Sequence, residues 1–447
     1  MNIVNQNMRH CYKQSELGEI PKDWEVIKFG DCICAVIDNR GKTPPLVNDG
    51  FPLLEVNALF KQGKSPNFEK VTKFVSKSTF ESWFRDGHPQ KGDILVVTVG
   101  SAGETSLVRE DGFCIAQNLI GLKTRNTISS DFLYYFTAST PFKKQVEAVL
   151  MGAVQPSLKV PHLNKFRVLM PSSREEQIAI ANALSDVDAL IQELEKLIAK
   201  KQAIKTATMQ QLLTGRTRLP QFAHHPDGRK KGYKPSELGE IPEDWEVKTY
   251  GDVFTFLSTS TNSRADLSNE GEYGYVHYGD IHTQWNNRLD LNTESLPRIS
   301  KHIVRSAFVM DGDLIMADAS EDYAGIGKSV EVFNLGDRQI VAGLHTFLLR
   351  DKSKALADGY RGYLHSIPAV KNSFDRLATG MKVYGISKNN LLSVCIPVPS
   401  LEEQTAIVTI LSAMDLELSV LVQRLDKTRQ IKQGMMQELL TGKTRLV

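Results

Sequence analysis

The stretch "YKQSELGEIPKDWEV" at residues 12–26 returns almost unchanged as "YKPSELGEIPEDWEV" at residues 233–247. Only two of its fifteen positions differ between the two copies. Self-similarity over so long a distance indicates a duplicated structural unit, and such a repeat decides the architecture before any local structure is considered.

Two further pairs of segments follow in the same order in both halves of the chain. They are "KGDILVVTVG" (91–100) with "DGDLIMADAS" (311–320), and the long segments 174–219 and 401–446, which end in "LLTGRTRL" and "LLTGKTRL". The chain is therefore interpreted as two copies of one unit, residues 1–219 and 220–447. The middles of the copies differ widely, which suggests one scaffold that carries two different binding surfaces.

Length and composition describe a multidomain protein of ordinary character. A chain of 447 residues is too long for a single core and predicts about two to four domains. The net charge of +2 is nearly balanced, which still allows a basic face for nucleic acid. The five cysteines are odd in number and predict no disulfide framework, which fits a reducing cytosol. No apolar run approaches about 18 residues and the N-terminus carries no apolar signal, so neither a membrane span nor secretion is expected.

The first part of each copy predicts a globular α+β domain. Short apolar runs between turn residues predict buried strands, among them residues 93–99 in the first copy and residues 274–281 and 313–319 in the second. Trp24 and Trp245 stand in the repeated opening motif. Both tryptophans are expected to anchor the core, because two domains with different surfaces still need the same scaffold.

The second part of each copy predicts one long helix. Serine followed by acidic residues opens each helix, which is typical of a capped N-terminus. Apolar residues then alternate three and four apart, which is the a/d spacing of a coiled coil. The predicted seam consists of Leu184, Val187, Ile191, Leu194 and Ile198 in the first helix and Leu411, Met414, Leu418, Leu421 and Leu425 in the second. The glycine of "LLTG" ends each helix.

A helix that is polar on its other faces cannot bury this seam alone, and its own duplicate is the expected partner. The alternative is that each helix packs on its own domain. A basic linker between the copies is long enough to reverse the chain, so the two helices can run antiparallel. The expected organisation is a first domain at 1–171, a spacer helix at 172–215, a linker at 216–235, a second domain at 236–399 and a second spacer helix at 400–443.

Motifs of the common enzyme classes are missing from the sequence. "AGIGKS" at residues 324–329 matches the end of a phosphate-binding loop, but Asp322 stands where that loop needs its first glycine. No dinucleotide-binding glycine motif, nucleophile elbow or histidine pair at metal-ligand spacing is present. The pattern favours a binding protein with no catalytic residues and no metal or cofactor site of its own.

Four features recur in both copies and together point to a known family. They are the "ELGEIPxDWEV" opening, the Gly92-Asp93 and Gly312-Asp313 strands, the domain endings at 152–177 and 380–404, and the "LLTG(R/K)TRL" finish of each helix. This set resembles the specificity subunit of type I restriction–modification systems over nearly the whole chain. The resemblance implies two tandem target recognition domains, separated by two long antiparallel coiled-coil helices and related by a pseudo-twofold internal repeat.

The resemblance also implies a role without catalysis in this chain. Each recognition domain would read one half of a bipartite, asymmetric site in double-stranded DNA, and the helices would set the spacer and dock the methyltransferase subunits. The implied partners are two modification subunits with N6-adenine methyltransferase activity and, in the full host-defence complex, two restriction subunits with motor and nuclease activity. S-adenosylmethionine, ATP and magnesium would belong to those partners, in the cytoplasm of a bacterium or archaeon.

Exposed loops supply the candidate DNA contacts. Base reading needs polar side chains on such loops, and phosphate anchoring needs lysine and arginine. The candidate DNA-binding residues are Arg40, Lys42, Thr43, Ser101, Gln155 and Lys159 in the first domain and Ser258, Arg264, Lys328, Lys382 and Tyr384 in the second. The alternative for each of them is a solvated surface loop.

Two other functions stay open on the sequence alone. One is an enzyme with nuclease or methyltransferase activity in the chain itself, which methylation by the purified chain would reveal. The other is a scaffold that binds only proteins. Failure to select a split DNA sequence when assembled with a modification partner would favour that scaffold.

Overall fold

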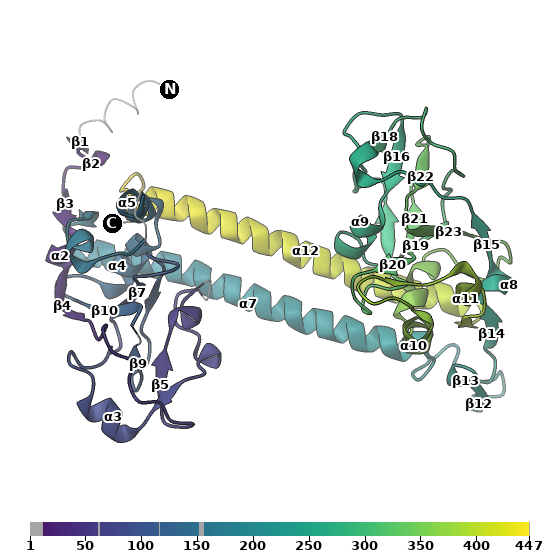
Figure 1. Cartoon of the computed structure of the whole chain (residues 1–447), viewed down its shortest axis with the longest axis horizontal. Coiled ribbons are helices and arrows are strands. Elements are labelled where there is room, and N and C mark those ends of the chain that lie inside the picture. The colour runs from purple at the N-terminus through teal and green to yellow at the C-terminus, as the bar shows by residue number, and fades with distance from the viewer. Residues whose placement is uncertain (1–11, 61–62, 116, 152–155, 447) are drawn as a thin grey trace. The chain divides into compact units, whose positions relative to one another are not determined.

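The computed structural model describes residues 12–60, 63–115, 117–151 and 156–446, which form two compact units. Unit 1 combines Met1–Lys196 with Val422–Val447, and unit 2 is Leu197–Leu421. Each unit therefore holds one globular domain together with part of each of the two long helices (Figure 1).

The first globular domain, domain 1, contains two small sheets with short helices around them. A four-stranded antiparallel sheet has the order β4 (Ile33–Ile37), β10 (Leu119–Thr124), β7 (Ile94–Val97) and β8 (Thr105–Leu107). A second sheet has the order β6 (Phe74–Val75), β5 (Phe51–Leu54) and β9 (Cys114–Ile115). Two further pairs are β1–β2 (Tyr12–Ser15, Gly18–Pro21) and β3–β11 (Trp24–Lys28, Arg167–Pro171). The helices are α2 (Phe29–Cys32), α3 (Lys77–Ser82), α4 (Ser130–Thr137), α5 (Thr140–Leu150) and α6 (Val160–Leu163), with 3-10 turns η1 (Val56–Ala58) and η2 (Phe68–Lys70).

Domain 2 repeats this scaffold and adds strands to it. The main sheet has the order β15 (Phe254–Leu257), β23 (Thr346–Asp351), β19 (Leu314–Ala317) and β21 (Ser329–Phe333), extended by β17 (Arg288–Asp290). The second sheet has the order β18 (Arg298–Ile299), β16 (Tyr273–Val276) and β22 (Ile340–Ala342). The repeated pairs are β12–β13 (Tyr233–Ser236, Gly239–Pro242) and β14–β25 (Glu246–Thr249, Cys395–Val398), and β20–β24 (Ala319–Ser320, Tyr384–Gly385) is added. The helices are α8 (Tyr250–Val253), α9 (Tyr278–Thr283), α10 (Pro368–Leu377) and α11 (Lys388–Leu392), with 3-10 turns η3 (Arg264–Asp266) and η4 (Arg361–Ser366).

One predicted strand is wrong in its second half. Residues 274–281 were expected to be one strand, but β16 ends at Val276 and α9 follows. The His277 side chain accepts a hydrogen bond from the Gly279 N–H at 3.0 Å and so caps the helix, while Asp280 supplies an acid in its first turn. A histidine cap therefore starts a helix where the apolar pattern alone indicated continued extension.

The two long helices are α7 (Arg174–Leu213) and α12 (Leu401–Leu439). In unit 1 Lys432 of α12 pairs with Asp188 of α7 at 2.6 Å. In unit 2 Lys205 of α7 pairs with Asp415 of α12. A later residue of one helix meets an earlier residue of the other in both units, so the helices run antiparallel and the two ion pairs are copies of each other.

The predicted seam positions are buried or half-buried along both helices. Leu184, Leu194, Leu411, Leu418 and Leu425 are buried, and the other five positions are intermediate. Leu184 lies in the core of domain 1 beside Leu439 and Leu440, while Leu411 shares the domain 2 core with Leu212 and Leu213. Each helix thus begins on its own domain and ends against the other domain, so both expected packing modes occur.

By length and composition, α12 contains a stretch apolar enough to cross a membrane, which was not expected from the sequence. In unit 2 the beginning of α12 packs Ile407 and Leu411 into the domain core, and Asp415 pairs with Lys205. One such helix is weak evidence for a membrane span.

Lock 1, formed by Asp23, Trp24, Glu176 and Arg445, closes domain 1 around the end of α12. The Trp24 indole N–H donates to the fully buried Glu176 carboxylate at 3.1 Å. Arg445 donates to the same carboxylate at 2.8 Å and to Asp23 at 2.7 Å. A residue from the end of the second copy therefore completes the first domain.

Lock 2, formed by Asp244, Trp245, Glu403 and Arg218, repeats this arrangement in domain 2. The Trp245 indole donates to Glu403 at 2.9 Å, and Arg218 donates to Glu403 at 2.7 Å and to Asp244 at 2.8 Å. Arg218 follows α7, which belongs to the first copy. The opening motif of each copy thus binds the residues that follow the long helix of the other copy.

Glycine at each helix end allows this close approach. Gly442 has a φ of +73°, and a Cβ there would lie 2.6 Å from Pro21. Gly215 has a φ of +69° and a Cβ there would meet Pro242 of the second motif. A side chain at either glycine would be strained in backbone and in space.

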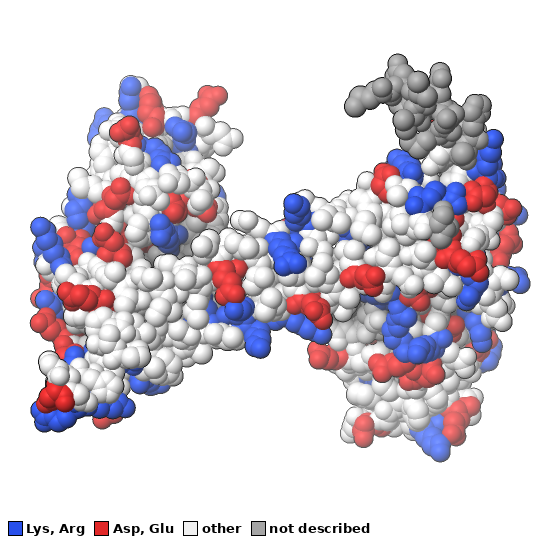
Figure 2. Space-filling view, turned by 180° about the vertical axis from the view of Figure 1, so that it is seen from behind, with Lys and Arg blue, Asp and Glu red and all other residues white. Residues whose placement is uncertain are grey.

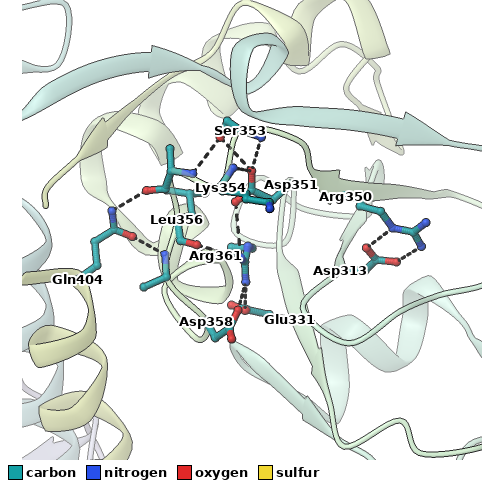
Figure 3. Close-up of polar contacts among 12 residues, drawn as sticks. Asp313, Glu331, Arg350, Asp351, Ser353, Lys354, Leu356, Asp358, Arg361 and Gln404 are labelled. Atoms are coloured by element: carbon teal, nitrogen blue, oxygen red, sulfur yellow. Dashed lines mark hydrogen bonds and ion pairs between the residues drawn. The ribbon is translucent and has the colours of Figure 1, made fainter. Parts of the chain in front are cut away.

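Domain 2 carries an ionic network around Glu331 and Arg361 (Figure 3), and domain 1 has an apolar residue at the position of Glu331. Glu331 is fully buried on β21, accepts from Arg361 at 2.7 Å and accepts from the Gly362 N–H at 3.0 Å. Burial raises the pKa of Glu331, and Arg361 opposes that shift. Leu107 takes the equivalent place in β8 of domain 1, since it pairs with Ile94 as Glu331 pairs with Leu314.

Candidate nucleic-acid interface

The loop at residues 38–45 lies after β4 in domain 1. Arg40 is held by its neighbour Asp38, with an Nε–Oδ1 distance of 2.7 Å, and this hydrogen bond raises the pKa of Arg40. Lys42 is exposed. Thr43 accepts a hydrogen bond from the Gln117 side chain at 2.7 Å, which joins this loop to the segment before β10.

The loop after β7 and the loop before α6 lie side by side in the same domain. Val99 and Ser157 form a main-chain bridge, and the Leu158 N–H donates to the Thr98 carbonyl at 2.8 Å. Two loops that were predicted separately as DNA contacts therefore form one edge.

Of the predicted residues in these two loops, Gln155 lies outside the described residues. Ser101 is half-buried, and its hydroxyl has no hydrogen-bond partner among the residues that the structure describes. Lys159 is exposed and stands at the N-terminus of α6.

Domain 2 joins the equivalent loops with the added β20–β24 pair. The Ile386 N–H donates to the Asp318 carbonyl at 2.9 Å, which matches the bond from Leu158 to Thr98 in domain 1. Tyr384 packs on Tyr323 with ring centroids 4.0 Å apart, and Lys382 beside it is exposed. Met381, at 96% exposure, forms an apolar tip on this loop and is not among the predicted contacts.

Of the other predicted residues of domain 2, Arg264 and Lys328 contact α9, and Ser258 contacts Ala307 instead. Arg264 pairs with Asp280 of α9 at 2.9 Å, and the Lys328 amine donates to the carbonyl of His282 in the same helix at 2.9 Å. Burial lowers the pKa of Lys328. Ser258 is exposed and instead accepts from the Ala307 N–H at 3.0 Å.

Three further polar residues stand at these edges and were missed. Asn118 precedes β10, while Asp318 follows β19 and His345 precedes β23. The strand common to the two copies is β7 in domain 1 and β19 in domain 2. Alignment of the copies through this common strand places Asp318 opposite Thr98, so the sequence already showed that the polar residue directly after the strand differs between the copies.

Charge is dispersed rather than concentrated on the face of the molecule that Figure 2 shows. On the face shown in Figure 2, lysine and arginine are interspersed with aspartate and glutamate on each domain. Across the described part of the chain, no group of three or more His, Cys, Asp or Glu side chains is arranged to hold a metal ion. The chemistry of these edges is that of hydrogen bonding and isolated cations, which suits recognition of bases and phosphates.

Comparison with known proteins relates this chain to one protein family. The model of the type I restriction modification DNA specificity domain matches the chain twice, at residues 21–206 and 242–428. The specificity subunit of the type I restriction enzyme MjaVIII from Methanocaldococcus jannaschii is 27% identical over 97% of each chain.

Two solved structures share the fold. A chain of a type I restriction–modification system, solved to study its complex assembly and conformational transition, has a TM-score of 0.56 at 16% identity and covers 95% of this chain and 99% of its own. The S subunit of the type I system from M. genitalium has a TM-score of 0.52 at 15% identity and covers 93% and 96%. Since the family match includes both repeats, and each match runs from the opening motif into the following long helix, the chain belongs to the type I restriction–modification DNA specificity family and carries two of its domains.

Proposed function

We propose that this chain selects DNA for a type I restriction–modification complex, with each domain reading one half of a bipartite, asymmetric site in double-stranded DNA. The main support is that the four strands β4-β10-β7-β8 of domain 1 and β15-β23-β19-β21 of domain 2 have the same order, while the two domains present different side chains at the same edge. A shared frame with different side chains is what two different half-sites require.

The helices give this proposal its geometry. The two copied ion pairs, Asp188 with Lys432 and Asp415 with Lys205, hold the helices antiparallel within each unit, which supports a role of the helices in setting the spacer between half-sites. The internal repeat offers two equivalent docking places, which fits two modification subunits that methylate adenine N6. S-adenosylmethionine, ATP and magnesium are assigned to those subunits and to two restriction subunits, in the cytoplasm, and this chain is assigned no catalysis of its own.

A domain exchange tests the proposal. Residues 27–170 are replaced by those of another family member, which leaves the opening motif and α7 in place. Methylome sequencing of cells that carry the modification subunits is expected to show one changed half-site, with the other half-site and the spacer retained. The matched exchange of residues 248–398 should change only the other half-site. A change in both half-sites from either exchange, or in neither, would contradict the proposal.

A further inference from the structure

Both domains hold the same main-chain frame where the common strand ends. In domain 1 the Thr98 N–H donates to the Asn118 carbonyl at 2.8 Å. In domain 2 the Asp318 N–H donates to the His345 carbonyl at 3.1 Å. The frame places one residue that follows the common strand beside one that precedes the neighbouring strand, β10 or β23.

The side chains on this frame differ completely. Thr98 is fully buried and its hydroxyl donates to the Asn118 carbonyl at 3.0 Å, so Asn118 alone is exposed. In domain 2 the Asp318 and His345 side chains are 26% and 51% exposed, with Oδ1 and Nδ1 3.4 Å apart. His345 has a φ of +56°, in the left-handed region that few non-glycine residues occupy.

Asn118 adjoins a cavity, and His345 adjoins an aromatic ring. Asn118 lines a cavity of about 420 Å³ with Thr43 and Lys73, in which Gln117 and Thr43 are already hydrogen-bonded. The His345 and Tyr278 rings pack in a T-shaped arrangement with centroids 5.5 Å apart, and this contact limits rotation of the His345 ring. A polar side chain in a hollow or held by an aromatic ring can recognise a base edge without first losing much conformational freedom.

We infer that Asn118 in domain 1 and the Asp318–His345 pair in domain 2 are specificity-determining residues that contact base edges. A carboxamide matches the acceptor N7 and the amino group N6 of adenine, so Asn118 is assigned an A·T pair. A carboxylate accepts from the amino group of cytosine and an imidazole N–H donates to guanine, so Asp318 with His345 is assigned a C·G pair. This inference rests on the proposed function, because it names the residues that would recognise the bases of each half-site.

The test uses the chain assembled with its modification subunits. Affinity is measured at one fixed salt concentration for duplexes that carry every single base-pair substitution in both half-sites. Asn118→Ala, Asp318→Asn and His345→Ala are each expected to lose discrimination at one base pair, by roughly 5- to 150-fold, while the other positions keep theirs. The affected position should be A·T for the first variant and C·G for the other two.

Two controls replace exposed residues of the same types, asparagine and histidine, elsewhere in the same domains. Asn126→Ala changes an exposed asparagine at the other end of β10, and His302→Ala changes an exposed histidine of domain 2. Neither control should alter discrimination. Unchanged discrimination in the three test variants would overturn the inference, as would equal weakening on every duplex or a change in both half-sites. If the wild-type complex showed no bipartite preference at all, the proposed function itself would fail, which is a separate result.

Discussion

At the scale of single residues, the two locks show why arginine stands after each helix. Glu176 and Glu403 are buried carboxylates, and each needs more than one donor to offset its lost hydration. The planar guanidinium of Arg445 or Arg218 reaches two carboxylates at once, which a lysine amine does less well. The second carboxylate, Asp23 or Asp244, is the residue just before the tryptophan.

Removal of one lock arginine should be strongly destabilising. Arg218→Ala leaves Glu403 buried without its counter-charge, and we expect a loss of about 3–5 kcal/mol in the free energy of unfolding. Urea denaturation of the full chain measures this loss. Arg229→Ala removes an arginine whose side chain is 81% exposed and should change stability by less than about 0.5 kcal/mol. Similar losses in both variants would show that lock 2 contributes little.

Acid should weaken both locks. Hydrogen bonding from Arg445 lowers the pKa of Asp23. Burial acts to raise the pKa of Asp244, but hydrogen bonds from Arg218 and Lys231 outweigh it and lower that pKa. An unfolded aspartate has a pKa of about 3.9, so the stabilisation is complete above that pH and is lost as pH falls through the lower folded pKa.

Urea unfolding between neutral pH and pH 2 measures this dependence. The difference in unfolding free energy between the wild type and Asp244→Asn should be largest above about pH 4 and should shrink below it. A difference that stays constant down to pH 2 would contradict the assignment of this carboxylate to the lock.

At the scale of elements, sequence periodicity predicted most of the architecture. The α+β domains, the two long helices and their antiparallel pairing are confirmed. These features could be predicted because apolar spacing and capping residues are local signals in the sequence. The helix α9 was missed, because a histidine cap overrode an apolar run.

The candidate DNA contacts stay predictions. Sequence could place Arg40 and Lys328 on loops, but their bonds to Asp38 and to a helix carbonyl depend on folded geometry.

Alanine substitutions at Gly434, within α12, and at Gly442, just after α12, should change the stability of the protein in opposite directions. Gly442→Ala places a Cβ 2.6 Å from Pro21 at a positive φ, and we expect a loss of more than about 1 kcal/mol. Gly434→Ala lies within the helix with nothing within 4 Å of the new Cβ, and should stabilise by about 0.5–1 kcal/mol. Thermal unfolding of the two variants separates these outcomes. Stabilisation by Gly442→Ala would refute the close approach in lock 1.

At the scale of the whole molecule, the helices connect the two units. Leu194 and Leu421 lie close to the points where the chain passes between units, after residues 196 and 421. In each helix this point separates the ion pair of unit 1 from the ion pair of unit 2. Both copied ion pairs can therefore survive a matched insertion at these two positions.

Insertion of one heptad after Leu194 and one after Leu421 should change the spacer of the recognised site. Seven residues add about 10 Å of helix, which corresponds to about three base pairs. Methylome sequencing should show both half-sites unchanged. Insertion after Leu194 alone is the control, because it cannot keep both ion pairs in register and should reduce stability and methylation. Altered half-sites in the doubly extended chain would show that the helices do not set the spacing.

The reciprocal locks also impose an order on biosynthesis. Glu176 must wait for Arg445, which is 269 positions further along the chain, whereas Glu403 finds Arg218 already made. At a translation rate of about 5–20 residues per second, the delay is on the order of ten seconds to a minute. The domain that leaves the ribosome first is therefore finished last. A chain whose synthesis stops before Arg445 therefore holds the buried Glu176 carboxylate without its arginine partner, and lock 1 stays open until the last residues are made.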